Sequence, residues 1–234
     1  MVSVCKLDAT RNTGKHTKQS YVRCMQINLL HSKIATANLM QITEEESTDI
    51  LCILEPYTIQ NKVFAIPNKC RTYTLAHTRS RTAIVVINEH IDVLLLKQHW
   101  DADTIVAEIT VDGVKLNMTR IYFDIGRPIE EDLSKIVAVL QHENALGVVL
   151  ATDSNSRSAS WHDSTTKARG RTLNEYLISK QLYIFNEEGL NTRFRNGRNV
   201  SNIDLTIITN QLLRTVSRWE ISDKESSFDH DIIK

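Results

Sequence analysis

Two short runs of apolar residues constrain the possible fold most strongly. Residues 49–54 (DILCIL) and 147–151 (GVVLA) carry apolar side chains at consecutive positions rather than at alternate ones. A strand with this pattern is buried on both faces, which happens in sheets that are covered on both sides. The chain therefore needs a layered arrangement, in which helices or a second sheet cover each face of each sheet.

The rest of the chain alternates between strand-like and helix-like segments. Apolar and β-branched residues predict further strands over 21–29, 82–87, 93–96, 104–111, 114–123, 182–185, 203–208 and 219–221. Asp112-Gly113 predicts a type I′ hairpin, because both central residues of that turn have positive φ. Apolar residues at helical spacing predict helices after Ser32, after Pro128 and over 173–181. This mixture of hairpins and strand–helix–strand units favours one α/β domain with mixed sheets covered by helices.

The two ends of the chain differ from its middle. Residues 1–20 are polar and without periodicity, which predicts a flexible N-terminal arm and a domain over 21–234. A last strand that begins at Asp231 and stops at Lys234 suggests a fragment of a longer polypeptide. Residues 55–81 form a long, weakly patterned connection. The four cysteines contain no C-x-x-C pair, which favours reduced structural thiols in an intracellular protein.

Polar residues stand at the carboxyl ends of the apolar strands, or just before the last strand. Ligands of open α/β sheets bind beyond such strand ends. The set consists of Asn28, Glu55, Tyr122, Asp153, Asn155, Asp204, Asp229 and His230. Carboxylates and amides suit Mg²⁺, which prefers oxygen ligands and keeps several waters, and the phenol and the imidazole suit a phosphate.

Each of these residues also has an ordinary structural explanation. Asn or Asp at a strand end often forms a turn, and Glu55 can be a solvated loop carboxylate. Tyr122 can be a core aromatic, and Asp229 with His230 can be a surface pair. Asp204 differs, because it lies inside an apolar strand and burying an unpaired carboxylate is costly. His230 is the natural partner for it.

The order of the motifs is more specific than any one of them. From the N-terminal side they are Q-I-N (26–28), L-E-P (54–56), I-Y (121–122), D-S-N-S-R-S (153–158), S-N-I-D (201–204) and D-H (229–230). In this order they resemble the endonuclease–exonuclease–phosphatase superfamily. More closely, the chain resembles over 21–234 the apurinic-endonuclease-like domain of non-LTR (LINE-type) retrotransposon proteins. Two neighbours depart from the family pattern: Thr152 stands where glycine is usual, and Phe228 separates Ser227 from Asp229.

The resemblance implies a fold and a reaction. The fold class is α/β, with two mixed β-sheets packed face to face and flanked by helices in a four-layer sandwich. The reaction is the nicking of one strand of double-stranded DNA, with Mg²⁺ or Mn²⁺ as cofactor. It leaves a 3′-hydroxyl that primes an attached reverse transcriptase during insertion. The implied location is intracellular, in the nucleus at the site of action, and no membrane partner is implied.

The resemblance also assigns roles around the metal and the attacking water. Glu55 is the principal metal ligand, with Asn28 close to it. His230, held by Asp204, contacts the scissile phosphate and helps to activate the water, and Asp153 is the alternative base.

The remaining assigned residues act on the phosphate or on its neighbours. Asn155 and Tyr122 donate hydrogen bonds to the developing phosphorane oxygens, where electrostatic stabilisation is most effective. Asp229 binds a metal or tunes His230. The choice between His230 and Asp153 as the base, the number of metals and the target sequence stay open.

The charge balance argues mildly against DNA binding, since 28 Lys+Arg are matched by 28 Asp+Glu. Positive charge can be local, however, and basic residues outnumber acidic ones over 157–198. The stretch 193–198 (RFRNGR) predicts a hairpin with Asn196-Gly197 as its turn. A basic hairpin can enter a DNA groove, although a solvated charged loop explains it equally simply. The candidate DNA contacts are Arg157, Arg193, Arg195 and Arg198.

Other functions stay open at this point. A phosphatase or phosphodiesterase for inositol phosphates or lipids would keep the fold, and the basic segment argues against it. A catalytically inactive DNA-targeting module would have no need of the acidic residues. An ordinary scaffold domain would leave the ordered motifs as coincidence.

Overall fold

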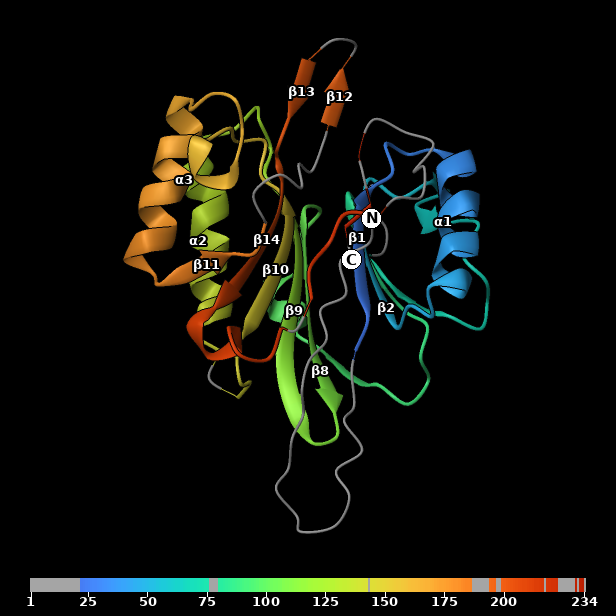
Figure 1. Cartoon of the computed structure of the whole chain (residues 1–234). Helices are drawn as coiled ribbons and strands as arrows, with labels where there is room; N and C mark the ends of the chain where they lie inside the picture. The colour runs from blue at the N-terminus through green and yellow to red at the C-terminus, as the bar shows by residue number, and fades with distance from the viewer. Residues whose placement is uncertain are drawn as a thin grey trace.

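The computed structural model describes residues 22–75, 80–142, 144–186, 194–196, 199–216, 218–222, 230 and 232–233, with only the backbone of 194–196 and 199. In this part of the chain three α-helices and two large sheets form four layers (Figure 1). Helix α1 (Lys33–Glu45) covers one outer side, and α2 (Ile129–Leu140) with α3 (Ala168–Ser179) covers the other. The predicted four-layer α/β sandwich is confirmed.

The first sheet has four strands in the order β1-β2-β6-β5. They are β1 (Cys24–Asn28), β2 (Ile50–Leu54), β6 (Thr82–Val86) and β5 (Arg71–Tyr73). β1 and β2 are parallel because α1 connects them, and the other pairs are antiparallel. Every residue of β1, β2 and β6 is buried, as the apolar run over 49–54 requires. Ser32 caps α1 by accepting a hydrogen bond from the backbone N–H of Ala35.

The second sheet has six strands in the order β11-β14-β10-β9-β8-β7. They are β11 (Leu182–Ile184), β14 (Asp204–Thr209), β10 (Val148–Asp153), β9 (Val114–Tyr122), β8 (Thr104–Val111) and β7 (Asp92–Leu95). β9 and β10 run parallel and the other neighbours antiparallel, so this sheet is also mixed. Asp112 and Gly113 connect β8 to β9 with φ of 47° and 79°, which confirms the predicted positive φ at both positions.

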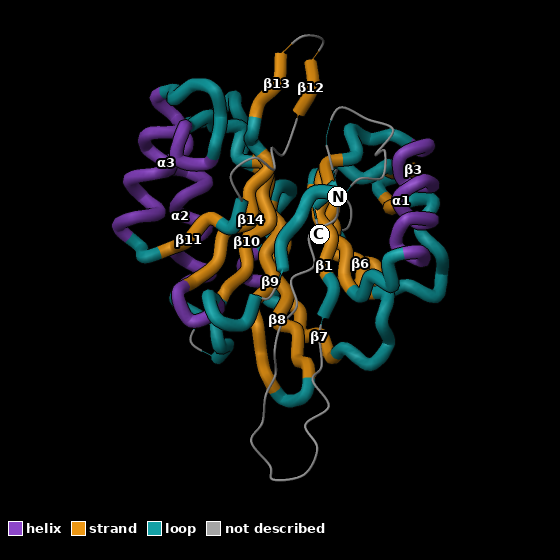
Figure 2. The backbone as a smooth tube through the Cα atoms, in the orientation of Figure 1, coloured by secondary structure: helices purple, strands orange, loops and turns teal. Residues whose placement is uncertain are grey.

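Figure 2 shows the order of the four layers, helix, sheet, sheet and helix, and apolar side chains fill the three spaces between them. The two sheets pack face to face through residues such as Ile84 and Met118. α1 packs on the first sheet through Leu39, and α2 with α3 packs on the second through residues such as Ile136. No helix of the described residues is both long and apolar enough to cross a membrane.

Some elements differ from their predicted bounds. Within 55–81, expected to be a long, weakly patterned connection, the chain forms β3 (Thr58–Ile59), β4 (Lys62–Val63) and β5. Strands of two or three residues are too short for a periodic pattern. α3 begins at Ala168 instead of 173, because its first turn is polar and carries no apolar spacing.

The predicted basic hairpin exists, but its connection is shifted by one residue. β12 (Phe194–Asn196) pairs with β13 (Asn199–Ser201), and Asn196 lies opposite Asn199. The connection is therefore residues 197–198 rather than Asn196-Gly197, and these two lie outside the described residues. The predicted arm, residues 1–20, also lies outside them.

The C-terminal segment lies along the free edge of the first sheet. Ile233 forms isolated bridges with Gln26 of β1 and with Ile221, where short strands over 219–221 and from Asp231 were expected. Backbone N–H groups of Gln26 and Ile233 donate to each other's carbonyl oxygens at 2.6 and 2.9 Å. This pairing brings His230 to the end of β1.

Candidate active site

Three neighbouring strands of the second sheet place a polar side chain at the same end. Tyr122 of β9 lies in register with Asp153 of β10, and Asp153 lies in register with Asp204 of β14. Residues in register on adjacent strands point to the same face, so these side chains form a row that faces the first sheet. We call Tyr122, Asp153 and Asp204 the catalytic row. Thr152, the departure from the family pattern, is buried on the opposite face, so it leaves the row intact.

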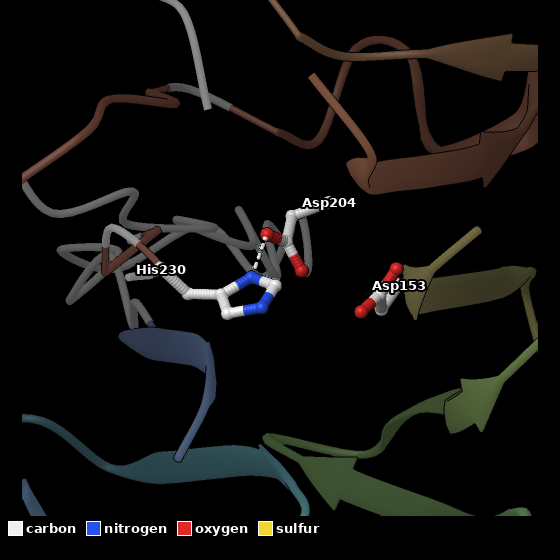
Figure 3. Close-up of side chains that lie close together, drawn as sticks. All are labelled: Asp153, Asp204 and His230. Carbon is white, nitrogen blue, oxygen red and sulfur yellow. Dashed lines mark hydrogen bonds and ion pairs between the residues drawn. The ribbon is translucent and has the colours of Figure 1, made fainter. Parts of the chain in front are cut away.

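His230 joins the catalytic row from the C-terminal segment. Its Nδ1 atom lies 2.7 Å from Oδ2 of Asp204, and both side chains are buried (Figure 3). This contact confirms the partner expected for a buried Asp204. One ligand atom each of Asp153, Asp204 and His230 lies within 4.8 Å of the other two, so the three could share a cation.

Two asparagines hold the carboxylate of Asp153 in place. Nδ2 of Asn28 donates to Oδ2 of Asp153 at 3.3 Å, and the backbone N–H of Asn155 donates to Oδ1 at 3.1 Å. The side-chain amide of Asn155 donates to the carbonyl of Phe123 at 3.0 Å. Both predicted asparagines therefore lie at the site and orient the carboxylate, Asn28 through its side-chain amide and Asn155 through its backbone N–H.

Glu55 lies beside this group but not within it. Among the described residues, the 4.8 Å group contains Asp153, Asp204 and His230 without Glu55. The backbone of Glu55, at a φ of 45°, is held on both sides: its N–H donates to the carbonyl of Arg81, and its carbonyl accepts from His31. Its Oε1 atom lies 3.7 Å from Nε2 of His31, and its negative charge helps to raise the pKa of His230.

The site mixes buried charges of both signs. Burial, helped by the neighbouring charge of Asp204, raises the pKa of Asp153 to about 7. Burial acts to lower the pKa of His230, but Asp204, by charge and hydrogen bond, and Asp153 outweigh it and raise the value to about 9. Burial and the charges of Asp153 and Glu55 raise the pKa of Tyr122, which keeps its phenol a neutral hydrogen-bond donor.

An arginine outside the predicted set of site residues supports Tyr122. The guanidinium carbon of Arg81 lies 4.5 Å from the centre of the Tyr122 ring, a cation–π contact. Arg81 also pairs with Asp103 at 2.5 Å and with Asp124 at 2.7 Å. These partners are 22 and 43 residues away, so no local motif marks the arrangement.

The predicted DNA contacts are only partly described. Nε of Arg157 donates to Asp163 at 2.8 Å, and the guanidinium also donates to the carbonyl of Val200, so this arginine holds the base of the hairpin. Arg195 lies in β12, which extends with β13 beyond the end of the sheet where β14 begins (Figure 1). The side chain of Arg195 and the predicted residues Arg193, Arg198 and Asp229 lie outside the described part of the chain.

Solved structures with the same fold include a retrotransposon endonuclease domain and AP endonucleases. The endonuclease domain of TRAS1, a telomere-specific non-LTR retrotransposon, is 25% identical with a TM-score of 0.79, over 91% of this chain and 96% of that one. An AP endonuclease from Archaeoglobus fulgidus is 14% identical with a TM-score of 0.65, over 91% of this chain and 97% of that one, and shows the fold alone.

A sequence relative points in the same direction. The 115 kDa protein of the type-1 retrotransposable element R1DM of Drosophila melanogaster is 24% identical over 221 residues, which are 89% of this chain. The chain spans about a fifth of the length of that relative. The family model for endonuclease–reverse transcriptase matches residues 116–234. The chain therefore belongs to the endonuclease–reverse transcriptase family, and its resemblance to non-LTR retrotransposon endonuclease domains is confirmed.

Proposed function

We propose that this chain is a divalent-metal-dependent endonuclease that nicks one strand of double-stranded DNA in the nucleus. The nick leaves a 3′-hydroxyl that an attached reverse transcriptase extends. The observation that carries the proposal is the catalytic row with His230 bonded to Asp204. The retrotransposon relatives favour DNA over inositol phosphates or lipids as the substrate.

The donor set of the site fits a hard divalent cation. Asp153 and Asp204 bring two carboxylates to one buried point, and their mutual repulsion helps to raise the pKa of Asp153. A cation would relieve that repulsion. Oxygen ligands of this kind suit Mg²⁺ or Mn²⁺, and Glu55, which directly follows β2, would be a further ligand. When bound, the ion supplies positive charge for the scissile phosphate and its leaving oxygen.

The residues of this chain supply orientation and proton transfer. Asp204 bonds to Nδ1 of His230 and orients the ring, and Nε2 is the nitrogen that would act on the scissile phosphate and the attacking water. Asp153, fixed by Asn28 and Asn155, is the second group that can position this water or accept its proton. Tyr122, kept neutral and held by Arg81, donates to a phosphorane oxygen.

A plasmid assay tests this function against the alternative. With Mg²⁺ the protein should convert supercoiled plasmid to nicked circles, and excess chelator should abolish the conversion. The Asp204→Asn protein, purified in parallel, controls for contaminating nucleases. Phosphate release from inositol polyphosphates by the same protein, with the plasmid left supercoiled, would overturn the proposal in favour of a phosphatase.

The hairpin β12–β13 is the proposed DNA contact. Replacing Arg193 and Arg195 together by alanine should weaken DNA binding at every sequence and lower the slope of log K against log salt by about 2, since two phosphate contacts are lost. Filter binding between low and moderate salt measures this slope. Arg218→Ala is the matched control, because that arginine is exposed and pairs with Glu220 instead. An unchanged slope would place the DNA elsewhere.

A further inference from the structure

A buried arginine lies directly beneath the catalytic row. Arg120 of β9 is 0% exposed and shares its face with Met118 and Tyr122, toward the first sheet. Burying a guanidinium in an apolar layer is costly unless opposite charges and hydrogen bonds compensate it. The residues around Arg120 should therefore include its counter-charges.

The strand register places those counter-charges. Arg120 lies in register with Ala151, which lies in register with Thr206. On each strand this position is two residues away from the catalytic row: Arg120 and Ala151 precede Tyr122 and Asp153, and Thr206 follows Asp204 on the antiparallel strand β14. Ala151 carries only a methyl group, so the long side chain of Arg120 has space over the middle strand. Successive residues on one face of a strand are within reach of such a side chain. The register therefore places the carboxylates of the row within reach of the guanidinium.

The guanidinium also touches the first sheet. Its Nη2 atom donates to the carbonyl oxygen of Ile27 at 3.2 Å, and the next residue, Asn28, donates to Asp153. Nε and Nη1 of Arg120 have no hydrogen-bond partner among the described residues. One neutral carbonyl does not balance a buried positive charge.

Three acidic groups act on this charge. Burial lowers the pKa of Arg120, while Cys52, Asp204 and Asp153 act in the opposite direction. Burial also raises the pKa of Cys52 to about 11, so its thiol is neutral near pH 7. The two aspartates therefore carry the compensating negative charge.

We propose that Arg120 is a positioning residue of the active site. Its fixed positive charge lets Asp153 and Asp204 lie side by side as carboxylates in the interior, and its bond to Ile27 keeps Asn28 on Asp153. The charge pairing rests on the burial of Arg120 and on the strand register, whereas its importance for nicking rests on the proposed function.

A double-mutant cycle in thermal unfolding, in chelator near pH 8, tests the pairing without any activity. Arg120→Met removes the charge but keeps the length, and it should lower Tm by about 10 °C, because it leaves buried carboxylates uncompensated. In the Asp153→Asn/Asp204→Asn background the same change should lose at least half of this effect. In the Asp132→Asn background, where a buried aspartate pairs instead with Arg127, Lys135 and Arg169, the full effect should persist.

Equal losses of Tm in all three backgrounds would overturn the proposal, since they would show a purely steric role. If the Arg120→Met single variant does not fold, the proposal requires that the triple variant, Arg120→Met with Asp153→Asn and Asp204→Asn, does fold. In kinetics, Arg120→Met should lower kcat at least tenfold with KM for DNA unchanged, and Arg120→Lys should recover most of it. If the parent protein does not nick DNA, the proposed function is refuted. The double-mutant cycle still tests the charge pairing, because it compares only Tm values.

Discussion

Replacing His230 by alanine should lower the rate constant of nicking by about 10³-fold, the range for loss of a positioned acid–base group. The imidazole is buried and bonded to Asp204 at one end of the catalytic row, so water cannot easily take its place. DNA affinity should stay close to that of the parent, because phosphate contacts outside the site supply most of it. Single-turnover nicking and equilibrium binding measure the two quantities separately.

A variant of Asp204, the hydrogen-bond partner of His230, provides a second test of the same role. Asp204→Asn should give a loss of similar size, and the double variant should be little worse than either single one, since the two residues act as a unit. His90→Ala is the matched control, an exposed histidine beyond the first sheet. Cleavage retained in the His230→Ala protein would refute its proposed role.

Replacing Asp153 by asparagine should have opposite effects on activity and stability. Nicking should fall to background, because a candidate base and metal ligand is lost. In chelator near pH 8, the free energy of unfolding should rise by about 1–3 kcal/mol, because an ionised carboxylate no longer lies buried beside Asp204. Denaturant unfolding measures the gain. Asp92→Asn, at an exposed position of β7, should change neither quantity.

The pH dependence of stability follows from the same groups in the metal-free protein. The pKa of Asp153 is raised to about 7 in the folded state, from an unfolded value of about 3.9, so its ionisation removes stability as pH rises between these values. The pKa of His230 is raised from 6.5 to about 9, so its stabilisation is complete below pH 6.5 and is lost as pH rises through 9. Tm in chelator should therefore fall from pH 5 to pH 9.

Two variants separate the contributions of Asp153 and His230 to this dependence of Tm on pH. Asp153→Asn should flatten the fall between pH 5 and 7, and His230→Ala should flatten the fall between pH 7 and 9. Because divalent ions bind the ionised carboxylates, Mg²⁺ should restore Tm mainly at the alkaline end. A profile that both variants leave unchanged would contradict the electrostatic description of the site.

Much of the fold follows from local patterns. The consecutive apolar residues over 49–54 and 147–151 predict strands covered on both faces, and these became the central strands β2 and β10. The turn at Asp112-Gly113 needs only two residues to be recognised. The short strands β3 and β4 have no pattern of their own, because pairing over two residues each defines them.

The site could be predicted as a set of residues but not as an arrangement. Asp153 and Asp204 lie opposite each other because β10 and β14 pair across a connection that carries α3, and no spacing in the sequence encodes this register. The contacts of Arg81 could not be predicted either, since its partners lie 22 and 43 residues away along the chain.

Arg120 is different, because the sequence does contain a signal for it. In β9 the apolar residues Val114, Leu116 and Met118 alternate with polar ones, and Arg120 continues the apolar positions. A charge in that phase of a strand predicts a buried arginine that needs a partner.

The chemistry of the nick tests the central claim most directly. Supercoiled plasmid, nicked by the protein with Mg²⁺, is divided between DNA ligase and a DNA polymerase with labelled nucleotides, without any end repair. The account predicts that ligase seals the nick and that the polymerase extends it, because hydrolysis leaves a 3′-hydroxyl and a 5′-phosphate. Nicks that need removal of a 3′-phosphate before extension, or a plasmid left supercoiled, would contradict it.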